Sequence, residues 1–290
     1  MPESEPPRPS SSPSSGPAPG AGPGCGVPAA LVRLLTAASL RLDLAGRRAD
    51  VVLAAPERRN PQTPSTWRAL AEAGGWLVDR ADVVVLRAEG PSFSAGLDRR
   101  ALTPAGIPGE FRLDELVTRD DGALDALIAE YQRGFTVWAD GPFLSIAAVQ
   151  GHAVGAGFQL ALACDLRIAA DDAQFSMREP ALGLVPDLTG THPLVAAVGY
   201  PRALEICATG RWVAAAEAAA LGLVQSVVPA GHLAAATDAF VAAVAAHPAA
   251  AVLATRGVLR GAARRTPHEQ RAVERAAQLP RLRALARGER

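Results

Sequence analysis

The sequence predicts an α/β fold with a C-terminal helical extension, and three observations lead to this prediction. Short apolar segments alternate with helix-forming segments from residue 29 onward. Two of the apolar segments, 82–90 and 145–151, are dominated by apolar residues, which is typical of strands buried on both faces of a parallel sheet. Beyond residue 230 only helical patterns remain. With 49% hydrophobic and 20% charged residues, the 290-residue chain can bury a full core.

The first half of the predicted core opens with two short strands, 40–46 and 50–56, joined as a hairpin by the turn residues that begin at Gly46. A helix is predicted over 64–80, because a proline near its start is compatible with the first helical turn. The buried strand 82–90 follows, and a Gly-Pro pair ends it.

The second half starts with a long polar loop and a helix around 120–139. The buried strand 145–151 comes next, and a glycine-containing turn and a short helix lead into a strand over 166–170. Three helices and a last strand complete this part: 190–198, 200–209, 214–221 and 224–229.

Both ends of the chain differ from this core of residues 29–229. Residues 1–28 contain nine Pro, six Ser and five Gly, so they cannot bury enough apolar surface to offset their ordering entropy, and we expect a disordered tail. A docking segment for a partner is the alternative. Residues 230–290 form the helical region, in which Thr266 and Glu269 make a capping-box signature and Pro280 predicts a bend or break. Ten arginines between 256 and 290 are either a solvated helix face or contacts to phosphates or a neighbouring subunit.

Composition excludes several classes of function. The 29 acidic and 29 basic residues cancel, which argues against a general nucleic-acid binder and against a polybasic membrane-surface protein. No apolar run reaches the length of ~18–20 residues that spans a bilayer. Three distant cysteines predict neither a disulfide scaffold nor a metal site, and we expect a reducing, cytoplasmic setting. Every basic residue is arginine, so mechanisms that need a lysine are excluded.

Two glycine-containing turns each follow a buried strand, GPSFSAGLD at 90–98 and QGHAVGAGFQL at 150–160. A turn of this kind that opens a helix leaves backbone N–H groups free to receive negative charge. Two such turns suggest two donors that converge on one oxygen. The glycine spacing does not match a dinucleotide-binding motif, and the segment from Gly90 to Ser94 lacks the second glycine of a nucleophile elbow. Ser94 would need a base to act as a nucleophile.

These turns and the segments around them resemble the enoyl-CoA hydratase/isomerase (crotonase) family. The resemblance covers most of 38–229 and includes LAAPERRNPQTPSTWRALAEA, FSAGLD, VQGHAVGAGFQLALACDLRIAADDAQFSMREPALGLVPDLTG and RWVAAAEAAALGLVQSVVP. It implies a crotonase-like spiral of β-β-α units, assembled as a homotrimer or hexamer, with C-terminal helices that serve oligomerisation and cover the active site. It also implies an acyl-CoA substrate and no separate cofactor.

The resemblance also assigns residues. The oxyanion hole falls on the backbone N–H groups of Leu97 and Ala156. The two glutamates of hydratases correspond to Gln159, which cannot act as a base, and to Glu179. Asp187 stands where simple hydratases have glycine, and this acid pair resembles the dienoyl-CoA isomerase branch. A surface loop glutamate at 179 and a helix-capping aspartate at 187 are the alternatives.

Residues near the turns are candidates for binding coenzyme A or substrate, and Arg100 matches a position where the family often has a basic residue. The full set is Arg58, Arg59, Ala95, Gly96, Asp98, Arg100, Gly155 and Phe158. We expect an apolar pocket lined by Phe93, Leu97, Phe158 and Leu184 to raise the pKa of the acids toward neutrality.

The function these assignments predict is double-bond isomerisation of an acyl-CoA through a thioester enolate, with Glu179 and Asp187 as the two acids. Enoyl-CoA hydration, in which Gln159 only holds the water, is the first alternative. A non-catalytic acyl-CoA-binding protein is the second. If Gln159 faces the substrate beside Glu179, Gln159→Glu would restore a hydratase pair.

Overall fold

The structure, a computed structural model, describes residues 26–110 and 112–289, and it confirms the predicted α/β class. Its main sheet has six strands in the order β1-β2-β4-β6-β8-β11. The hairpin pair β1–β2 is antiparallel and all other neighbours are parallel. The strands are β1 (Leu40–Ala45), β2 (Arg48–Leu53), β4 (Val83–Ala88), β6 (Leu144–Val149), β8 (Leu166–Ala170) and β11 (Ser226–Val228).

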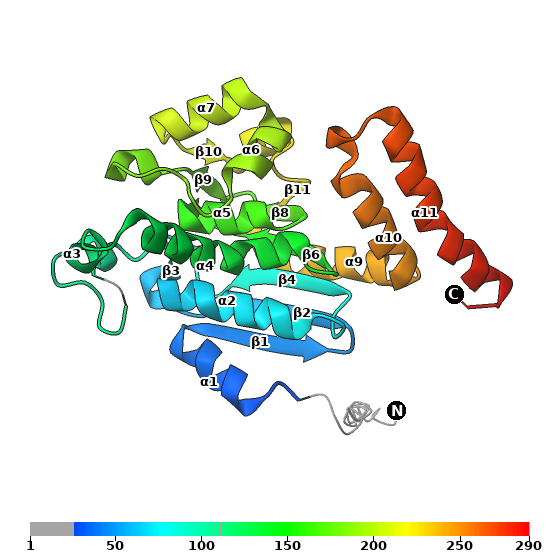
Figure 1. Cartoon of the computed structure of the whole chain (residues 1–290), viewed down its shortest axis with the longest axis horizontal. Helices are drawn as coiled ribbons and strands as arrows, with labels where there is room; N and C mark the ends of the chain where they lie inside the picture. Colours follow the sequence, from blue (N-terminus) through cyan, green and yellow to red (C-terminus); the bar gives the residue numbers. More distant parts are fainter. Residues whose placement is uncertain (1–25, 111, 290) are drawn as a thin grey trace, which may run out of the picture.

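The central strands are buried on both faces, as their apolar sequences predict. In β4, Val84 and Leu86 face one hydrophobic core, whereas Val83 and Val85 face a second core on the other side of the sheet. The first core is the larger one and includes apolar residues of α1 (Ala29–Ala37), α2 (Pro64–Leu77), α4 (Asp121–Asp140) and α5 (Ala156–Ala163). The second core includes residues of α9 (Leu233–Ala245), so helices cover both faces, as Figure 1 shows.

Two small sheets extend from the ends of the main strands and carry the glycine turns. Strands β3 (Pro61–Gln62) and β5 (Gly96–Leu97) form a parallel pair. Strands β10 (Val213–Ala214), β9 (Gln174–Ser176) and β7 (His152–Val154) form a three-stranded sheet. A parallel bridge between Ser94 and Ala153 joins the two turns. The segments of 90–98 and 150–160 therefore lie side by side although they are about 60 residues apart in the chain.

Short helices surround this region. They are η1 (Pro56–Arg58), η2 (Arg99–Leu102), α3 (Leu113–Leu116), η3 (Glu179–Leu182), α6 (Thr191–Val198), α7 (Tyr200–Thr209) and α8 (Ala215–Ala220). Helix α6 begins at Gly190 without a side-chain cap, so Asp187 does not cap it.

The C-terminal region consists of η4 (Ala230–His232), α9, α10 (Ala249–Arg260), η5 (Ala262–Arg264) and α11 (Pro267–Ala286). The capping box of Thr266 and Glu269 is present. The predicted break at Pro280 is wrong, because α11 continues through this residue. None of the residues of α11 is buried, so water can bond the carbonyl that proline leaves unpaired.

Two arginines of helix α10 bind α4 and its neighbours: Arg260 pairs with Asp140, and Arg256 makes the larger set of contacts. The guanidinium of Arg256 lies 2.7 Å from the carboxylate of Asp165 and donates to the carbonyl oxygens of Ala139 (2.6 Å) and Gly141 (2.8 Å). Helices α10 and α11 consequently stand to one side of the sheet (Figure 1).

Most of the predicted tail, residues 1–25, lies outside the described residues, and α1 begins at Ala29. Across the described chain, no single helix is long and apolar enough to cross a membrane. One bent pair, Ala230–Ala245 with Ala249–Arg264, passes such a test by length and composition alone.

Candidate active site

A cavity of about 660 Å³ lies where the two glycine turns meet the segment 178–188. Its floor combines backbone from both turns with two carboxylates, and a long wall is apolar. The lining residues are Trp67, Ala95, Gly96, Leu97, Arg99, Leu102, Leu116, Leu124, Leu127, Ile128, Tyr131, Val154, Gly155, Ala156, Arg178, Glu179, Ala181, Leu182, Leu184, Asp187 and Leu188. None of them comes from residues 230–289, so the described C-terminal helices do not line this cavity in their own chain.

Leu97 and Ala156 both line the cavity. In strand β5 the N–H of Asp98 donates to Gln62, so the N–H of Leu97 points to the opposite side of the strand. Ala156 is the first residue of α5, where backbone N–H groups have no partner within the helix. The two turns touch, because a Cβ atom on Gly96 would lie 3.4 Å from the backbone nitrogen of Ala156. This arrangement fits two donors aimed at one oxygen.

Glu179 is the first residue of η3 and is not a surface glutamate. Its Oε2 is buried and has no hydrogen-bond partner among the described residues, while its Oε1 accepts a hydrogen bond of 2.6 Å from the amide of Gln159. Burial raises the pKa of the Glu179 carboxyl, and the nearby negative charge of Asp187 raises it further. Hydrogen bonds from Gln159 and from the backbone lower this pKa in part.

Asp187 lies in the same cavity, on the loop between η3 and α6. The residue as a whole is exposed, but its carboxyl is partly withdrawn from solvent, and this partial burial is the main cause that raises its pKa. The backbone carbonyl of Asp187 accepts a 2.7 Å hydrogen bond from the side chain of Gln132 on α4. Glu179 and Asp187 are therefore two acids, both with raised pKa values, in a partly apolar cavity. Such groups can exchange protons with a substrate near neutral pH.

Gln159 is next to Glu179, as the motif spacing predicts, but it does not line the cavity. Its side chain is completely buried. The amide oxygen accepts hydrogen bonds from the backbone N–H groups of Leu188 (2.9 Å) and Gly190 (3.2 Å). Gln159 consequently lies behind the acid and does not face the cavity.

The predicted arginines are not those that reach the cavity. Arg58 and Arg100 both pair with Asp98, at 3.1 and 2.7 Å, and Arg59 is exposed outside the lining. Arg58 and Arg100 lower the pKa of the Asp98 carboxyl, and the hydrogen bond from Arg100 is the largest cause. The cavity is instead lined by two cations that the sequence analysis did not select, Arg99 and Arg178.

Neither of these cations has a carboxylate partner in the described part of the chain, and the guanidinium of Arg178 lies 5.0 Å from the ring of Trp212. In the sequence, the neighbouring residues Arg99 and Arg100 indicate that a basic side chain lies near the cavity. The sequence does not tell which of two neighbours in a short helix points inward.

The remaining predicted residues divide into two groups. Ala95, Gly96 and Gly155 line the cavity, and so do the apolar residues Leu97 and Leu184. Phe93 and Phe158 do not, because both are completely buried, and Phe158 packs against Phe175 at 5.4 Å. Leucines of α3, α4 and η3 supply the apolar wall in their place.

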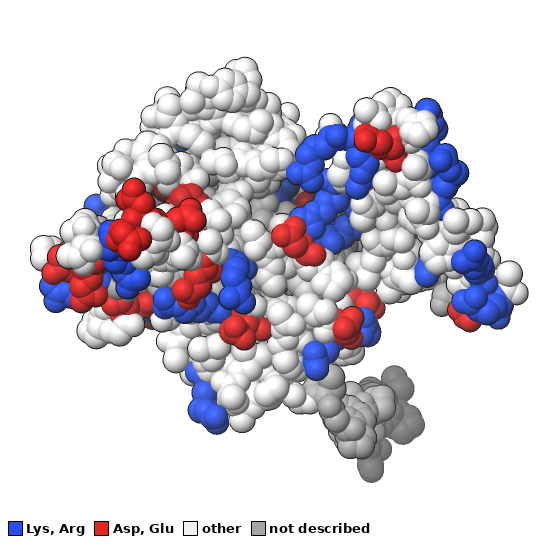
Figure 2. Space-filling model, in the orientation of Figure 1, with Lys and Arg blue, Asp and Glu red and all other residues white. Residues whose placement is uncertain are grey.

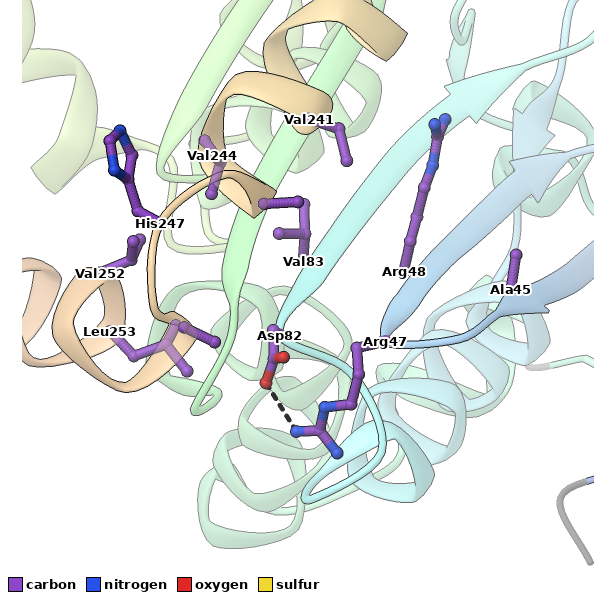
Figure 3. Close-up of a pocket in the computed structure, with 12 residues that line it drawn as sticks. Ala45, Arg47, Arg48, Asp82, Val83, Val241, Val244, His247, Val252 and Leu253 are labelled. Carbon is purple, nitrogen blue, oxygen red and sulfur yellow. Dashed lines mark hydrogen bonds and ion pairs between the residues drawn. The ribbon is translucent and has the colours of Figure 1, made fainter. Parts of the chain in front are cut away.

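A second pocket of about 350 Å³ lies between the start of β2 and β4 and the helices α9 and α10 (Figure 3). Its walls are mostly apolar, and the guanidinium of Arg47 is paired with Asp82 at 2.6 Å. It has no acid pair comparable to Glu179 and Asp187. No group of three or more His, Cys, Asp or Glu side chains that could hold a metal occurs within residues 26–110 and 112–289.

Two solved structures with a similar fold hold CoA or acetoacetyl-CoA. A Thermobifida fusca protein described as a candidate enoyl-CoA hydratase, in complex with CoA, has a TM-score of 0.83 and 48% identity, covering 88% of this chain and 97% of that one. The same description applies to a complex with acetoacetyl-CoA, at 49% identity, a TM-score of 0.83 and coverage of 87% and 97%. Fold and cavity together define a crotonase-type protein.

The sequence comparisons agree with this class. The model of the enoyl-CoA hydratase/isomerase family matches residues 49–280. A probable enoyl-CoA hydratase of Mycobacterium bovis is 32% identical over 185 residues, which are 63% of this chain and 66% of that protein. A mitochondrial Δ(3,5)-Δ(2,4)-dienoyl-CoA isomerase of Rattus norvegicus is 33% identical over 184 residues, 62% of this chain and 55% of the relative. The chain belongs to the enoyl-CoA hydratase/isomerase family.

Proposed function

We propose that the protein is an acyl-CoA isomerase that moves a double bond by proton transfer through a thioester enolate. The single observation that carries this proposal is the pair Glu179 and Asp187, two carboxyls with raised pKa values in one cavity with Leu97 and Ala156. Hydratases of the family use a second glutamate at the position of residue 159, and this chain has glutamine there. The rat dienoyl-CoA isomerase among the relatives supports the proposal.

The reaction divides into two proton transfers. The backbone N–H groups of Leu97 and Ala156 hold the thioester carbonyl oxygen and stabilise the enolate, a contribution typically worth about 3–4 kcal/mol per donor. One of the two acids, in its ionised form, takes a proton from the carbon next to the carbonyl. The other, protonated, returns a proton at the far end of the shifted double bond. The acids exchange their protonation states in one turnover, and no water is consumed.

Turnover on 3-enoyl-, 2-enoyl- and dienoyl-CoA tests the proposal. We expect isomerisation by the wild type, and its loss by roughly 10²–10⁴-fold in Glu179→Gln. Binding of an acyl-CoA with every isomerisation rate unchanged in Glu179→Gln would refute the assignment. Binding without turnover of any of the three substrates would identify a non-catalytic acyl-CoA-binding protein.

Enoyl-CoA hydration is the second candidate, because hydratase names dominate among the relatives and structural neighbours. In this reaction Glu179 performs both proton steps. Loss of the enoyl absorbance of crotonyl-CoA measures it directly. Robust hydration by the wild type would reverse the ranking of the two candidates.

We also propose assembly into a homotrimer or hexamer. Leu279, Leu282 and Leu285 on α11 are each more than half exposed, and the face over α6 and α7 shows few charges in Figure 2. Sedimentation at micromolar concentration tests this, and a monomer would contradict it. The expected cytoplasmic location is likewise a proposal, which cell fractionation tests.

A further inference from the structure

We propose that Gln159 is a positioning residue that sets the placement of Glu179 relative to Asp187 and does not touch the substrate. This inference rests on the proposed function only in so far as these two acids carry the proton transfers. Its evidence is the hydrogen-bond pattern of one buried amide.

The orientation of the Gln159 amide is determined by its surroundings. Its oxygen accepts from two backbone N–H groups, those of Leu188 and Gly190. A backbone N–H can only donate, so the oxygen must face both of them and the NH₂ group must face Glu179. The side chain is completely buried and is not among the residues that line the cavity. Gln159 therefore presents a fixed donor to the carboxylate and cannot turn toward the substrate.

The same amide controls the loop that carries Asp187. Leu188 directly follows Asp187, and Gly190 packs closely on the Gln159 side chain, because a Cβ at residue 190 would lie 2.6 Å from its Cγ. From the other side, the Gln132 amide on α4 donates to the carbonyl of Asp187. The Asp187 loop is thus held between α4 and α5, and Gln159 is the group that joins it to Glu179.

The donor at 159 also opposes the influences that raise the pKa of the Glu179 carboxyl. Burial and Asp187 both raise the pKa of the Glu179 carboxyl. Burial raises the pKa of the Cys207 thiol, and the negative charge of Glu179 raises it further. The thiol therefore stays neutral and does not stabilise the carboxylate. The Arg178 guanidinium contacts Trp212 instead of the acid. Among these neighbours Gln159 is the side chain that stabilises the ionised form.

The test measures the titration of Glu179 directly in the unliganded protein. Side-chain ¹³C-labelled glutamate gives the carboxyl signals, and the signal missing in Glu179→Gln identifies Glu179. In Gln159→Met, which removes the donor, we expect the midpoint to rise by about one pH unit, because a hydrogen bond to a charged group is lost. The matched control is Gln150→Met, since the Gln150 amide likewise donates hydrogen bonds, here to two backbone carbonyls, but lies away from the cavity. It should leave the midpoint unchanged. An unchanged midpoint in Gln159→Met would overturn the inference.

Gln159→Glu provides the second arm, and it also serves if Gln159→Met does not fold. A carboxylate at 159 keeps an acceptor for Leu188 and Gly190 but places two acids together, so we expect the pair to titrate in two coupled steps. Since this position does not face the cavity, the added carboxylate should not raise hydration of crotonyl-CoA above the wild-type rate. A gain of about tenfold or more, a margin set below the roughly 10²–10⁴-fold that a positioned base supplies, would show contact with substrate and overturn the inference. If the wild type isomerises no substrate and the midpoint still shifts in Gln159→Met, the proposed function fails and the positioning role stands.

Discussion

Gly155 lies directly against the carboxylate of Glu179: a Cβ atom at residue 155 would be 3.2 Å from Oε1. Gly155 has φ +50° and ψ −118°, and its N–H donates to the carbonyl of Ser176. The next residue, Ala156, supplies one of the two proposed oxyanion donors. The acid and the donor are therefore held side by side by a backbone conformation that only glycine adopts readily.

Gly155→Ala should lower isomerase kcat/KM by at least about tenfold, because strain of about 1–3 kcal/mol would shift the donor and the acid together. The control is Gly183→Ala, since Gly183 also has a positive φ (+74°) but open space around it. Steady-state kinetics on both variants make the comparison. Equal losses of activity in the two variants would mean that backbone strain alone is responsible.

Glu179→Gln should be more stable than the wild type at neutral pH although it loses activity. The folded-state pKa of Glu179 is above its ordinary value of 4.5, so ionisation of this carboxyl opposes folding. The protonated Glu179 carboxyl stabilises the folded state fully at pH values below the pKa of the unfolded state. This stabilisation is lost as the pH rises through the pKa of the folded state. Thermal melts from pH 4 to pH 8 should therefore show the variant gaining over the wild type as the pH rises. A constant difference would contradict the raised pKa.

Arg99→Gln and Arg178→Gln should each raise KM for a CoA thioester by about tenfold, the effect of one lost hydrogen bond to a charged group. Arg100→Gln, the matched variant, should have little effect because its guanidinium is paired with Asp98. Competition with free CoA under varied salt measures the affinities. If Arg100→Gln bound the CoA thioester more weakly than Arg99→Gln and Arg178→Gln do, the sequence-based choice of Arg100 as the CoA-binding residue would be correct.

Much of this fold is predictable because its signals are local. The apolar strands β4 and β6, the helix that begins at Thr266 and the glycine turns depend on residues close together in the chain. The candidate acids Glu179 and Asp187 could be selected through family resemblance, and the structure places both in one cavity.

What could not be predicted depends on distant partners. The direction of the Gln159 amide follows from Leu188 and Gly190, which are about 30 residues further along. Asp98 neutralises Arg58 across 40 residues, whereas Arg99 and Arg178 are the cations at the cavity. Whether Pro280 breaks a helix depends on solvent exposure along α11, which the pattern of residues does not reveal.

Arg256→Met should lower the free energy of unfolding by about 3 kcal/mol, because it leaves the partly buried Asp165 without its ion pair. Arg275→Met on the exposed surface of α11 is the control and should have little effect. Urea unfolding of both variants gives the difference. An equal stability of the two would mean that the contacts of Arg256 contribute nothing measurable to holding α10.

Leu127→Trp should shorten the acyl chain that the enzyme accepts. Leu127 lines the apolar wall, so the larger ring fills space that a long chain needs, with a cost of about tenfold in kcat/KM. We expect this loss for 3-decenoyl-CoA and little change for 3-hexenoyl-CoA. Ala126→Trp adds the same ring at an exposed position of the same helix and serves as the control. Equal losses for both chain lengths would place the acyl group elsewhere.

The apolar wall and the acids come from different stretches of the chain. Leu116, Leu124, Leu127 and Ile128 belong to α3 and α4, whereas Glu179 and Asp187 belong to η3 and the loop after it. Mutations in the first stretch can therefore alter which acyl groups fit without touching the groups that move protons. Under selection, such a layout would let the substrate range of a lineage drift while its reaction is retained, and laboratory evolution could recombine the two stretches independently.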